Sequence, residues 1–489
     1  MKSLENLNFD NTYSQLPEVF GTKLLPTPLP EPYLVSFNLE GAELIDLDPK
    51  EVNRPEFVTF FSGNRLLPGS QPLAMLYSGH QFGVYVPQLG DGRAILLGEV
   101  VNHNGERWDL HLKGAGKTPY SRHGDGRAVL RSTIREYLCS EAMHGLRIPT
   151  TRSLCIIGSD DKVMREMVET SAVLLRLAPS HIRFGSFEVF YYCEEFEPLQ
   201  TLAEYVIEFH FPFLKGKEDR YIGLFAEIVK RTAKLIAHWQ SVGFAHGVMN
   251  TDNMSVLGLT FDYGPFGFMD SYDPTFICNH SDHTGRYAFH QQPRIGFWNL
   301  TRLAKALSPL FPMGEAQEVL ESYQSLLIAQ FHTDMRKKLG LNETQKDDEA
   351  LIGEFLHLMH QDGVDYTICF RAMGHFQRDS KTNHSKVRDL FVDREAFDHW
   401  AQKYRNRLKL ENTQDSERKT QMDGVNPKYV LRNYLAQVAI LKAVEERDFS
   451  EIDRLLFLLK SPFHEHPEME HYADLPPDWA RHIQVGCSS

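Results

Sequence analysis

Residues 246–264 read HGVMNTDNMSVLGLTFDYG, and this stretch decides which fold the rest of the chain is expected to adopt. It contains the pair Asp252-Asn253, a short apolar run and then Asp262-Tyr263-Gly264. This order predicts a loop, a tight β-hairpin and a second loop, with the polar groups collected at one end. Amide and carboxylate oxygens are hard ligands, and on two facing loops they suit Mg²⁺ that is bound together with nucleotide phosphates.

The same order of residues resembles the catalytic loops of protein kinases, which read HRDxxxxN and then DFG. Aligned on Asn253, His246 matches the kinase His and Asp262 matches the Asp of DFG. Val248 stands where a kinase has its catalytic Asp, so the metal ligands are present and the usual base is missing. Asp and Asn are also common in ordinary turns, so other segments must show whether this stretch is a kinase-like nucleotide site.

The composition is that of a globular protein with two or three domain-sized units: 489 residues, of which 42% are hydrophobic and 24% charged. A net charge of −13 argues against nucleic acid as the main partner, because phosphate backbones need a basic surface. The sequence shows neither a membrane-spanning apolar run nor a secretory leader, and its six cysteines are scattered. We therefore expect a cytoplasmic protein with no membrane partner.

Two glycine-containing turns and a lysine organise the first half of the chain. Residues 82–89, 94–100 and 108–116 have the pattern of three antiparallel strands, and Lys113 lies near the end of the third. The turn between the first two contains Gly90, Gly92 and Arg93. A second Gly-Asp-Gly-Arg turn, at residues 124–127, precedes a helix with Leu130, Ile134 and Leu138 on one face and Glu136 at its middle. Such turns present backbone N–H groups and arginines to a polyphosphate.

Residues 114–118, GAGKT, imitate the end of a P-loop, but His111 stands where that motif needs glycine, so we reject a P-loop. Further strands are expected at 153–159, 163–178 and 187–193. Arg176 interrupts the apolar part of the second of these, and Arg183 follows it. A buried arginine needs a partner, which could be a nucleotide phosphate or a structural carboxylate.

These patterns predict an α+β, protein-kinase-like bilobal fold with an antiparallel-sheet N-lobe and a mostly helical C-lobe. We expect four parts: an extended arm at 1–60, the N-lobe at 61–195, the C-lobe core at 196–335, and a helical C-terminal extension at 336–489 with a redox-accessible tail.

With these motifs in place, the chain resembles the selenoprotein O family over nearly its whole length. The resemblance lies in QLGDGRA at 88–94, DLHLKGAGKTPYSRHGDGRAVLRSTIREYL at 109–138, HGVMNTDNMSVLGLTFDYGPFGFMD at 246–270, FICNHSDHTGRYAF at 276–289 and NPKYVLRNYLAQ at 426–437. It implies a kinase-like fold that binds ATP in a reversed orientation and transfers AMP to Ser, Thr or Tyr hydroxyls of proteins, with the protein itself among the candidate substrates.

The resemblance also implies a role for individual residues. Asp252 would accept the proton of the hydroxyl, Asn253 and Asp262 would bind Mg²⁺ or Mn²⁺, and Glu136 would pair with Lys113. Those that would bind ATP are Gly90, Gly92, Arg93, Lys113, Asp125, Gly126, Arg176, Arg183 and Asp262. Selenocysteine-bearing members carry that residue near the C-terminus, where this chain has Cys487.

Three functions remain open on the sequence. The first is a protein adenylyltransferase, and the second is an ATP-dependent phosphotransferase in which Asp252 replaces the missing base. The third is a non-catalytic nucleotide-binding scaffold. Val248 argues against the second, and the presence of both metal ligands argues against the third. We also expect that Cys278, which follows the Asp-Tyr-Gly motif, could form a regulatory disulfide with Cys487.

Overall fold

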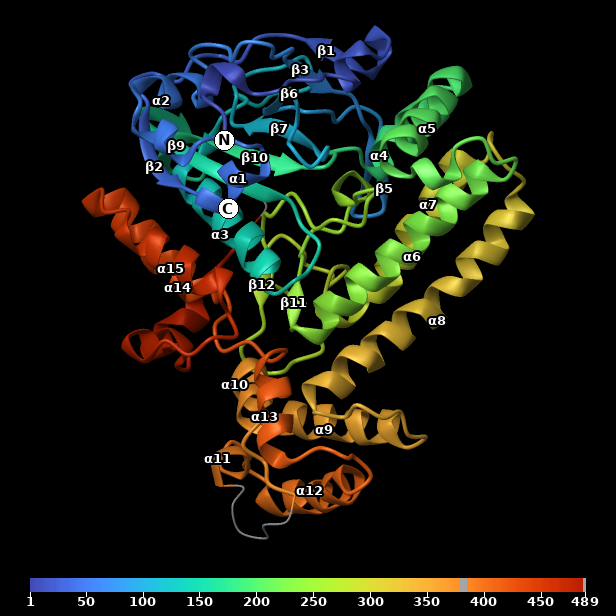
Figure 1. The fold of residues 1–489 in the computed structure, drawn as a ribbon, viewed down its shortest axis with the longest axis vertical. Helices are drawn as coiled ribbons and strands as arrows, with labels where there is room; N and C mark the ends of the chain where they lie inside the picture. Colours follow the sequence, from blue (N-terminus) through green and yellow to red (C-terminus); the bar gives the residue numbers. More distant parts are fainter. Residues whose placement is uncertain (379–384, 487–489) are drawn as a thin grey trace.

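The computed structural model describes residues 1–378 and 385–486, which form an antiparallel sheet at one end of the molecule and a large helical region below it (Figure 1). The main sheet has the strand order β1-β3-β6-β7-β10-β9-β2, and β8 pairs with β10. Every pairing within it is antiparallel. Its strands are β1 (Gly21–Lys23), β2 (Tyr33–Phe37), β3 (Leu73–Met75), β6 (Ala94–Val101), β7 (Arg107–Lys113), β8 (Ala128–Val129), β9 (Arg152–Met164) and β10 (Val168–Ala178).

The segment predicted as an extended arm supplies both edges of this sheet. Its strand β1 pairs with β3 at one edge, and its strand β2 pairs with β9 at the other. The same segment folds into two short helices, α1 (Leu39–Leu44) and α2 (Pro55–Phe61). Phe57, Phe60 and Phe61 of α2 are buried against one face of the sheet.

The two faces of the sheet have different surroundings, because successive side chains on a strand point to opposite faces. In β7, Leu110 and Leu112 join the core under α1 and α2, while His111 and Lys113 point the other way. In β10, Val173, Leu175 and Leu177 join the same core, so Arg176 faces the helical region. Alternation along two paired strands therefore brings buried polar side chains together on one face.

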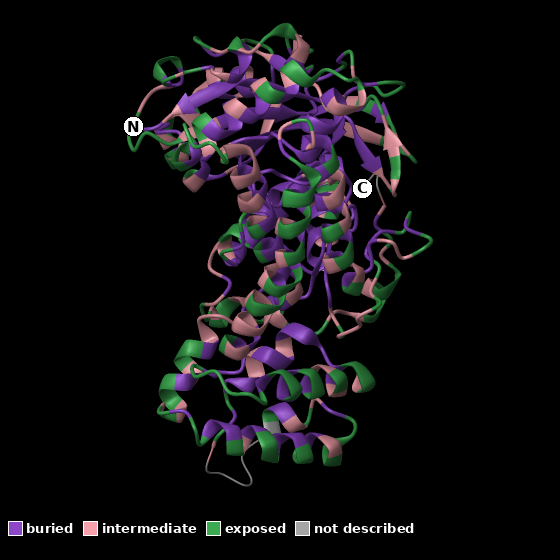
Figure 2. Cartoon of the chain, turned by 90° about the vertical axis from the view of Figure 1, so that its right-hand side faces the viewer, coloured by how far each residue is buried: buried purple, intermediate pink, exposed green. Residues whose placement is uncertain are grey.

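The helical region consists of long helices under the sheet and a separate cluster, residues 348–378 and 385–423, at the end of the molecule opposite the sheet (Figure 1). Helix α3 crosses under the sheet, α6 packs along α7 and α8, and α14 and α15 pack on α3. The buried residues of α9, α10 and α12 form a second core, which Figure 2 shows below the first. The helices beyond α2 are α3 (Leu130–Gly145), α4 (Phe184–Tyr192), α5 (Phe196–His210), α6 (Arg220–Ser241), α7 (Gln292–Leu307), α8 (Met313–Lys338), α9 (Asp348–Asp362), α10 (Tyr366–Met373), α11 (Ser385–Arg388), α12 (Arg394–Leu408), α13 (Asp415–Asp423), α14 (Asn433–Leu441) and α15 (Ser450–Lys460).

The helix predicted after the second Gly-Asp-Gly-Arg turn is confirmed as α3, whereas the strand predicted at 187–193 is wrong. Most of that segment belongs to helix α4. Its aromatic residues favour strands by propensity, but Phe184, Phe187 and Phe190 recur every three residues and are buried on one helical face. Tertiary packing of this face outweighs the local preference.

Two hairpins also differ from the prediction. The segment expected to form a hairpin after Asn253 instead has a 3-10 turn at Thr251–Asn253, followed by single bridges from Ser255 to Arg183 and from Thr260 to Thr150. The first of the three expected N-terminal strands is β5 (Val84–Val86), which pairs with β4 (Gly79–Gln81) in a hairpin of its own. A further two-stranded pair, β11 (Phe244–Ala245) and β12 (Gly267–Phe268), flanks the Asp252 and Asp262 loops.

Candidate active site

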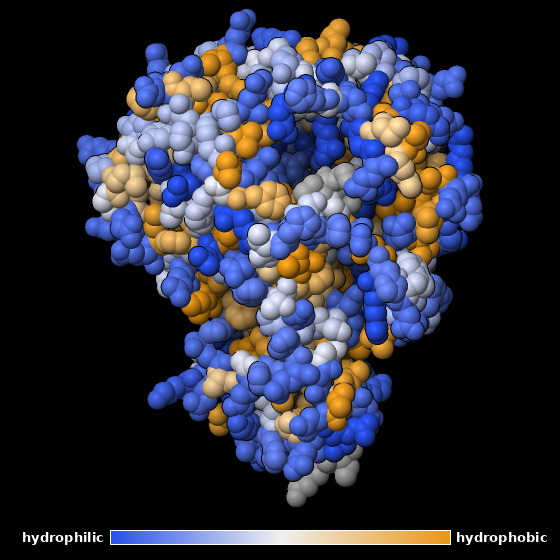
Figure 3. Space-filling view, turned by 180° about the vertical axis from the view of Figure 1, so that it is seen from behind, coloured by the Kyte–Doolittle hydropathy of each residue, from blue (hydrophilic) through white to orange (hydrophobic). Residues whose placement is uncertain are grey.

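A polar cavity of about 630 Å³ lies where the lower face of the sheet meets the loops that carry Asp252 and Asp262. The space-filling view from behind shows a hollow lined by hydrophilic residues in the upper half of the molecule (Figure 3). The lining contains most of the residues singled out in the sequence: Gly90, Gly92, Arg93, Lys113, Asp125, Gly126, Arg176, Asp252, Asn253 and Asp262. Segments far apart in the chain, from Gly90 to Asp262, thus meet around one space.

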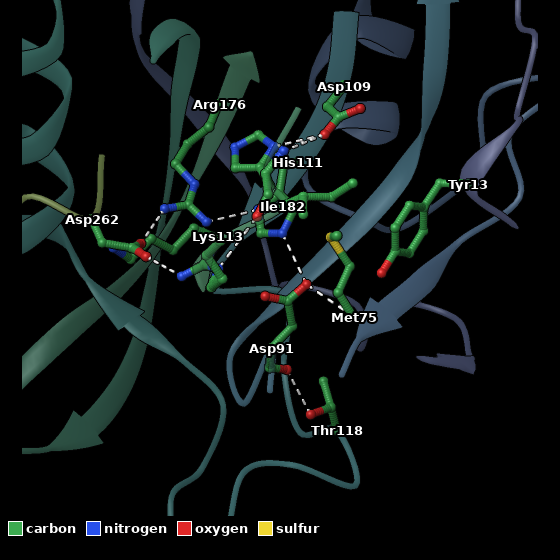
Figure 4. Close-up of polar contacts among 12 residues, drawn as sticks. Tyr13, Met75, Asp91, Asp109, His111, Lys113, Thr118, Arg176, Ile182 and Asp262 are labelled. Carbon is green, nitrogen blue, oxygen red and sulfur yellow. Dashed lines mark hydrogen bonds and ion pairs between the residues drawn. The ribbon is translucent and has the colours of Figure 1, made fainter. Parts of the chain in front are cut away.

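Lys113 and Arg176 lie next to each other at the inner wall of the cavity, on the paired strands β7 and β10 (Figure 4). Lys113 Nζ donates to Glu136 Oε2 of α3 at 2.5 Å, which is the ion pair expected from the sequence. Arg176 Nη1 donates to the other oxygen of Glu136 at 3.1 Å. Burial lowers the pKa of Lys113, while the charge of Glu136 opposes that shift.

Asp262 is the carboxylate that pairs with these cations. Its carboxylate accepts from Arg176 at 2.5 Å and from Arg183 at 2.6 Å, and Lys113 Nζ lies 3.5 Å away. Burial alone would raise the pKa of Asp262, but the charges of Arg183, Arg176 and Lys113 hold it well below its usual value. Arg183 lies behind this carboxylate, between the rings of Tyr77 and Phe261.

The sequence left open whether Arg176 and Arg183 would meet phosphate or a structural carboxylate, and in this structure both meet a carboxylate. Three cations, Lys113, Arg176 and Arg183, nevertheless share only Glu136 and Asp262 within this cluster. We call these five residues the cavity cluster. Its surplus of positive charge, next to a polar cavity, is an environment that binds a polyanion.

A buried chain of hydrogen bonds that the sequence did not suggest connects the first glycine turn to Arg176 (Figure 4). Arg176 Nη2 donates to His111 Nδ1 at 2.8 Å, so His111 carries its proton on Nε2, which donates to Asp91 Oδ2 at 3.0 Å. Burial lowers the pKa of His111, in keeping with this neutral form. The one available signal was its spacing of two from Lys113, which places both side chains on one face of β7.

The backbone of the second glycine turn packs closely against Gly116, and a side-chain ion pair holds the turn in place. Gly126 has a φ of +74°, and a Cβ there would lie 2.1 Å from the carbonyl oxygen of Gly116. Asp125 accepts from Arg165 at 2.7 and 2.8 Å, which attaches the turn to the β9–β10 connection. The carboxylate of Asp125 therefore helps to fix the shape of the cavity wall.

Asp252 lies at the other side of the cavity and has an unusual environment for a carboxylate. Its side chain is 6% exposed, Oδ2 accepts from Gln81 Nε2 at 3.0 Å, and Oδ1 is buried with no hydrogen-bond partner among the described residues. Burial raises the pKa of Asp252 to about 7, although the bond from Gln81 acts in the opposite direction. A carboxylate with a pKa near neutrality and one free oxygen is suited to accept a proton.

The donor set of these loops fits a divalent cation. Asn253 Nδ2 donates to the carbonyl oxygen of Val248 at 3.0 Å, which orients the amide and leaves Oδ1 as a hard ligand. Asp262 adds a carboxylate on the same cavity. Among the described residues, no group of three or more His, Cys, Asp or Glu side chains is arranged to hold a metal.

Of the two cysteines considered for a disulfide, Cys278 is buried, with its Sγ 2.7 Å from the carbonyl oxygen of Pro265. The neighbouring His280 N donates to Val485 O at 2.8 Å, so the last described residues lie beside this segment. Cys487 itself lies outside the described residues, and the disulfide stays a prediction.

Comparison with known proteins gives a consistent result over the full length of the chain. The family model described as "Protein adenylyltransferase SelO" matches residues 3–460. Proteins called protein nucleotidyltransferase YdiU are 58% identical in Myxococcus xanthus, over 489 residues, and 56% identical in Thioalkalivibrio sulfidiphilus, over 495 residues. The one from Thiobacillus denitrificans is 54% identical over 489 residues, and each alignment covers 100% of both chains. In the described part of this chain, no helix has both the length and the apolar character needed to cross a membrane.

Proposed function

Because the chain belongs to the SelO family of protein adenylyltransferases, we propose that its polar cavity binds ATP and transfers AMP to hydroxyl groups of proteins, releasing pyrophosphate. The observation that carries this proposal is the pairing of two features across one cavity. One wall presents the cation surplus of the cavity cluster, and the other presents Asp252 with a pKa near 7 and an unpartnered oxygen.

The phosphates of ATP would lie against the wall made by Lys113, Arg176 and Arg93, with the glycine turns at 90–92 and 124–126 beside them. Arginine forks and the lysine ammonium neutralise charge that develops on the leaving pyrophosphate. Arg183 would act through Asp262, which it holds from behind. Asp91 and His111 would keep the guanidinium of Arg176 in the orientation that the phosphates require.

The reversed nucleotide that the family resemblance implies explains the valine at position 248. In that orientation the α-phosphorus lies near Asp252 rather than near the position of the missing kinase base. Asp252 then accepts the proton of a Ser, Thr or Tyr hydroxyl as its oxygen attacks the α-phosphorus in line with the departing pyrophosphate. Val248 has no proton-accepting group, so a γ-phosphoryl transfer in the usual orientation has no base at that position.

Asn253 and Asp262 would hold Mg²⁺ or Mn²⁺ between the loops and the phosphates. When bound, the cation would neutralise phosphate charge and hold the phosphates in position. Holding it would require Asp262 to exchange part of its contact with Arg176 for the cation, while Arg176 would turn to the phosphates and Arg183 would keep its contact with Asp262 from behind.

In this proposal the sheet and the helices below it correspond to the two lobes of a protein-kinase-like fold, with residues 61–195 and 196–335 on the two sides of the nucleotide. Residues 1–60 complete the edges of the first lobe, and residues 336–489 form the C-terminal extension. A disulfide between Cys278 and Cys487 would connect the end of that extension to the segment after Asp-Tyr-Gly. Identical activity of fully oxidised and fully reduced enzyme would exclude a regulatory role for it.

The test is to incubate the purified protein with Mg²⁺, a bacterial lysate and ATP labelled either on the α- or on the γ-phosphate. Protein-bound label from α-labelled ATP alone is the expected result. Label from the γ-phosphate would mean phosphotransfer, with Asp252 acting as its base. Label from neither, on the lysate or on the protein itself, would favour a nucleotide-binding scaffold.

A further inference from the structure

The hairpin formed by β4 and β5 contacts the loop that carries Asp252 through three consecutive residues on each side. The backbone N–H of His80 donates to Thr251 Oγ1 at 2.6 Å, and that of Phe82 donates to Asn250 Oδ1 at 3.2 Å. Between them, Gln81 Nε2 donates to Asp252 Oδ2 at 3.0 Å. Residues 80–82 and residues 250–252 are far apart in sequence but form one hydrogen-bonded unit.

Buried groups hold this unit in place from behind. Glu188 of α4 is fully buried, and its two oxygens contact His80 Nδ1 at 2.8 Å and Thr251 Oγ1 at 2.6 Å. The hairpin approaches so closely that a Cβ on Gly79 would lie 2.7 Å from Asp252 Oδ1 and 3.0 Å from its backbone nitrogen. The position of Asp252 is thus set by the hairpin as much as by its own loop.

The contact from Gln81 makes the two oxygens of Asp252 unequal. Oδ2 is occupied by the Gln81 amide, whereas Oδ1 is buried without a partner among the described residues. Gln81 and Asp252 both line the cavity, so the amide of Gln81 holds this carboxylate at the cavity wall.

We propose that Gln81 is a positioning residue for the transfer reaction, which holds the carboxylate of Asp252 in the orientation that accepts the proton of the acceptor hydroxyl. This inference rests on the function proposed above. In the step, the hydroxyl proton passes to the carboxylate of Asp252, and the hydroxyl oxygen forms its bond to the α-phosphorus. The bond from the α-phosphorus to the bridging oxygen breaks, and pyrophosphate leaves with that electron pair. Gln81 acts through the carboxylate of Asp252, whose orientation it fixes.

The test compares Gln81→Met with the wild-type enzyme in transfer of label from α-labelled ATP. Methionine has a similar length but cannot donate a hydrogen bond, so the carboxylate loses its fixed orientation. We expect kcat to fall about 10- to 100-fold while the KM for ATP, nucleotide affinity and melting temperature stay unchanged. The control is Val84→Thr, because Val84 lies opposite Gln81 in the same hairpin but is 68% exposed, and it should keep wild-type kcat.

A second variant reaches the same carboxylate without touching Gln81. Gly79→Ala places a methyl group against Asp252, and it should lower kcat with ATP binding retained. In a double-mutant cycle, Gln81→Met should add nothing to the loss caused by Asp252→Ala, because Gln81 acts only through that residue.

Three results would each overturn this role. The first is an unchanged kcat in Gln81→Met, and the second is a fall in kcat that is accompanied by a loss of ATP affinity and a lower melting temperature. The third is a double-mutant cycle in which the losses of kcat caused by Gln81→Met and Asp252→Ala add together. Absence of transfer by the wild-type enzyme in the same assay would instead overturn the proposed function.

Discussion

Two clusters of buried charged residues in this protein contain the same types of ion pair but differ in the sign of their net charge. In the cavity cluster, three cations share two carboxylates beside an open polar space. In the C-terminal helical region, Arg407 alone pairs with Asp348 at 2.6 Å and with Glu411 at 2.8 Å. We call these three residues the helical cluster.

The surplus carboxylate of the helical cluster is satisfied within the protein. Glu411 also accepts from the backbone N–H groups of Asn342 and Glu343, and Asp348 accepts from that of Gln345. The surplus cation of the cavity cluster faces the cavity instead. A buried ion pair is therefore a weak sign of function by itself, and an unbalanced charge on the wall of a cavity is a much stronger one.

The largest effect is expected outside both clusters, at Asp252. Asp252→Ala removes the proton acceptor but none of the cations, so kcat should fall by about 10²–10⁴-fold while ATP binding persists. Calorimetric titration with Mg-ATP and the labelled-transfer assay measure the two properties separately. Asp262→Ala is the contrasting variant, because it should weaken binding of Mg-ATP as well. Unaltered transfer by Asp252→Ala would exclude it as the base.

Breaking the helical cluster should cost stability without affecting chemistry. Arg407→Met leaves two buried carboxylates without their cation and should lower the free energy of unfolding by about 3–5 kcal/mol. Urea unfolding measures the loss, and transfer per folded molecule should stay at the wild-type value. Lys403→Met on the same helix is the control, because its pair with Glu354 is exposed and should contribute less than about 1 kcal/mol.

The matching substitution in the cavity cluster should have the opposite outcome. Arg176→Met reduces the cation surplus, and Glu136 and Asp262 keep Lys113 and Arg183 as partners, so the loss of stability should be smaller than for Arg407→Met. Its kcat/KM for ATP should fall by about 10²–10³-fold, as for other preorganised groups that stabilise developing charge. Equal losses of stability in the two variants would remove the distinction between the clusters.

The smallest effect concerns a buried lysine that belongs to neither cluster. Lys338 lies over the ring of Phe370 at 4.4 Å, and burial lowers its pKa to about 7. Between pH 7 and its unfolded pKa of about 10.4, the unfolded chain binds this proton and the folded protein does not, so its contribution to stability rises with pH. At pH 7, Lys338→Met should therefore have a higher free energy of unfolding than the wild type. This difference should shrink by about 1 kcal/mol for each pH unit above 7. Urea unfolding at pH 7, 8 and 9 measures this, and a constant difference would contradict it.

The sequence by itself determined the features that depend on local pattern. The alternation of β7 placed Lys113 near the end of a strand, and the spacing of Leu130, Ile134 and Leu138 predicted helix α3. The family resemblance then implied the Lys113–Glu136 pair, which the structure shows. The long motif runs were sufficient to indicate the family, because such runs are specific without any knowledge of their contacts.

Only the tertiary structure decided which groups meet across long separations. Arg176 and Asp262 are 86 residues apart, and Gln81 and Asp252 are 171 apart, so no local pattern connects them. The segment 187–193 shows the same limit, because its aromatic residues favour a strand and become a helix only when one face packs into the core. Local periodicity is set by neighbouring residues, whereas partners, burial and the pKa of Asp252 are set by packing of the whole chain.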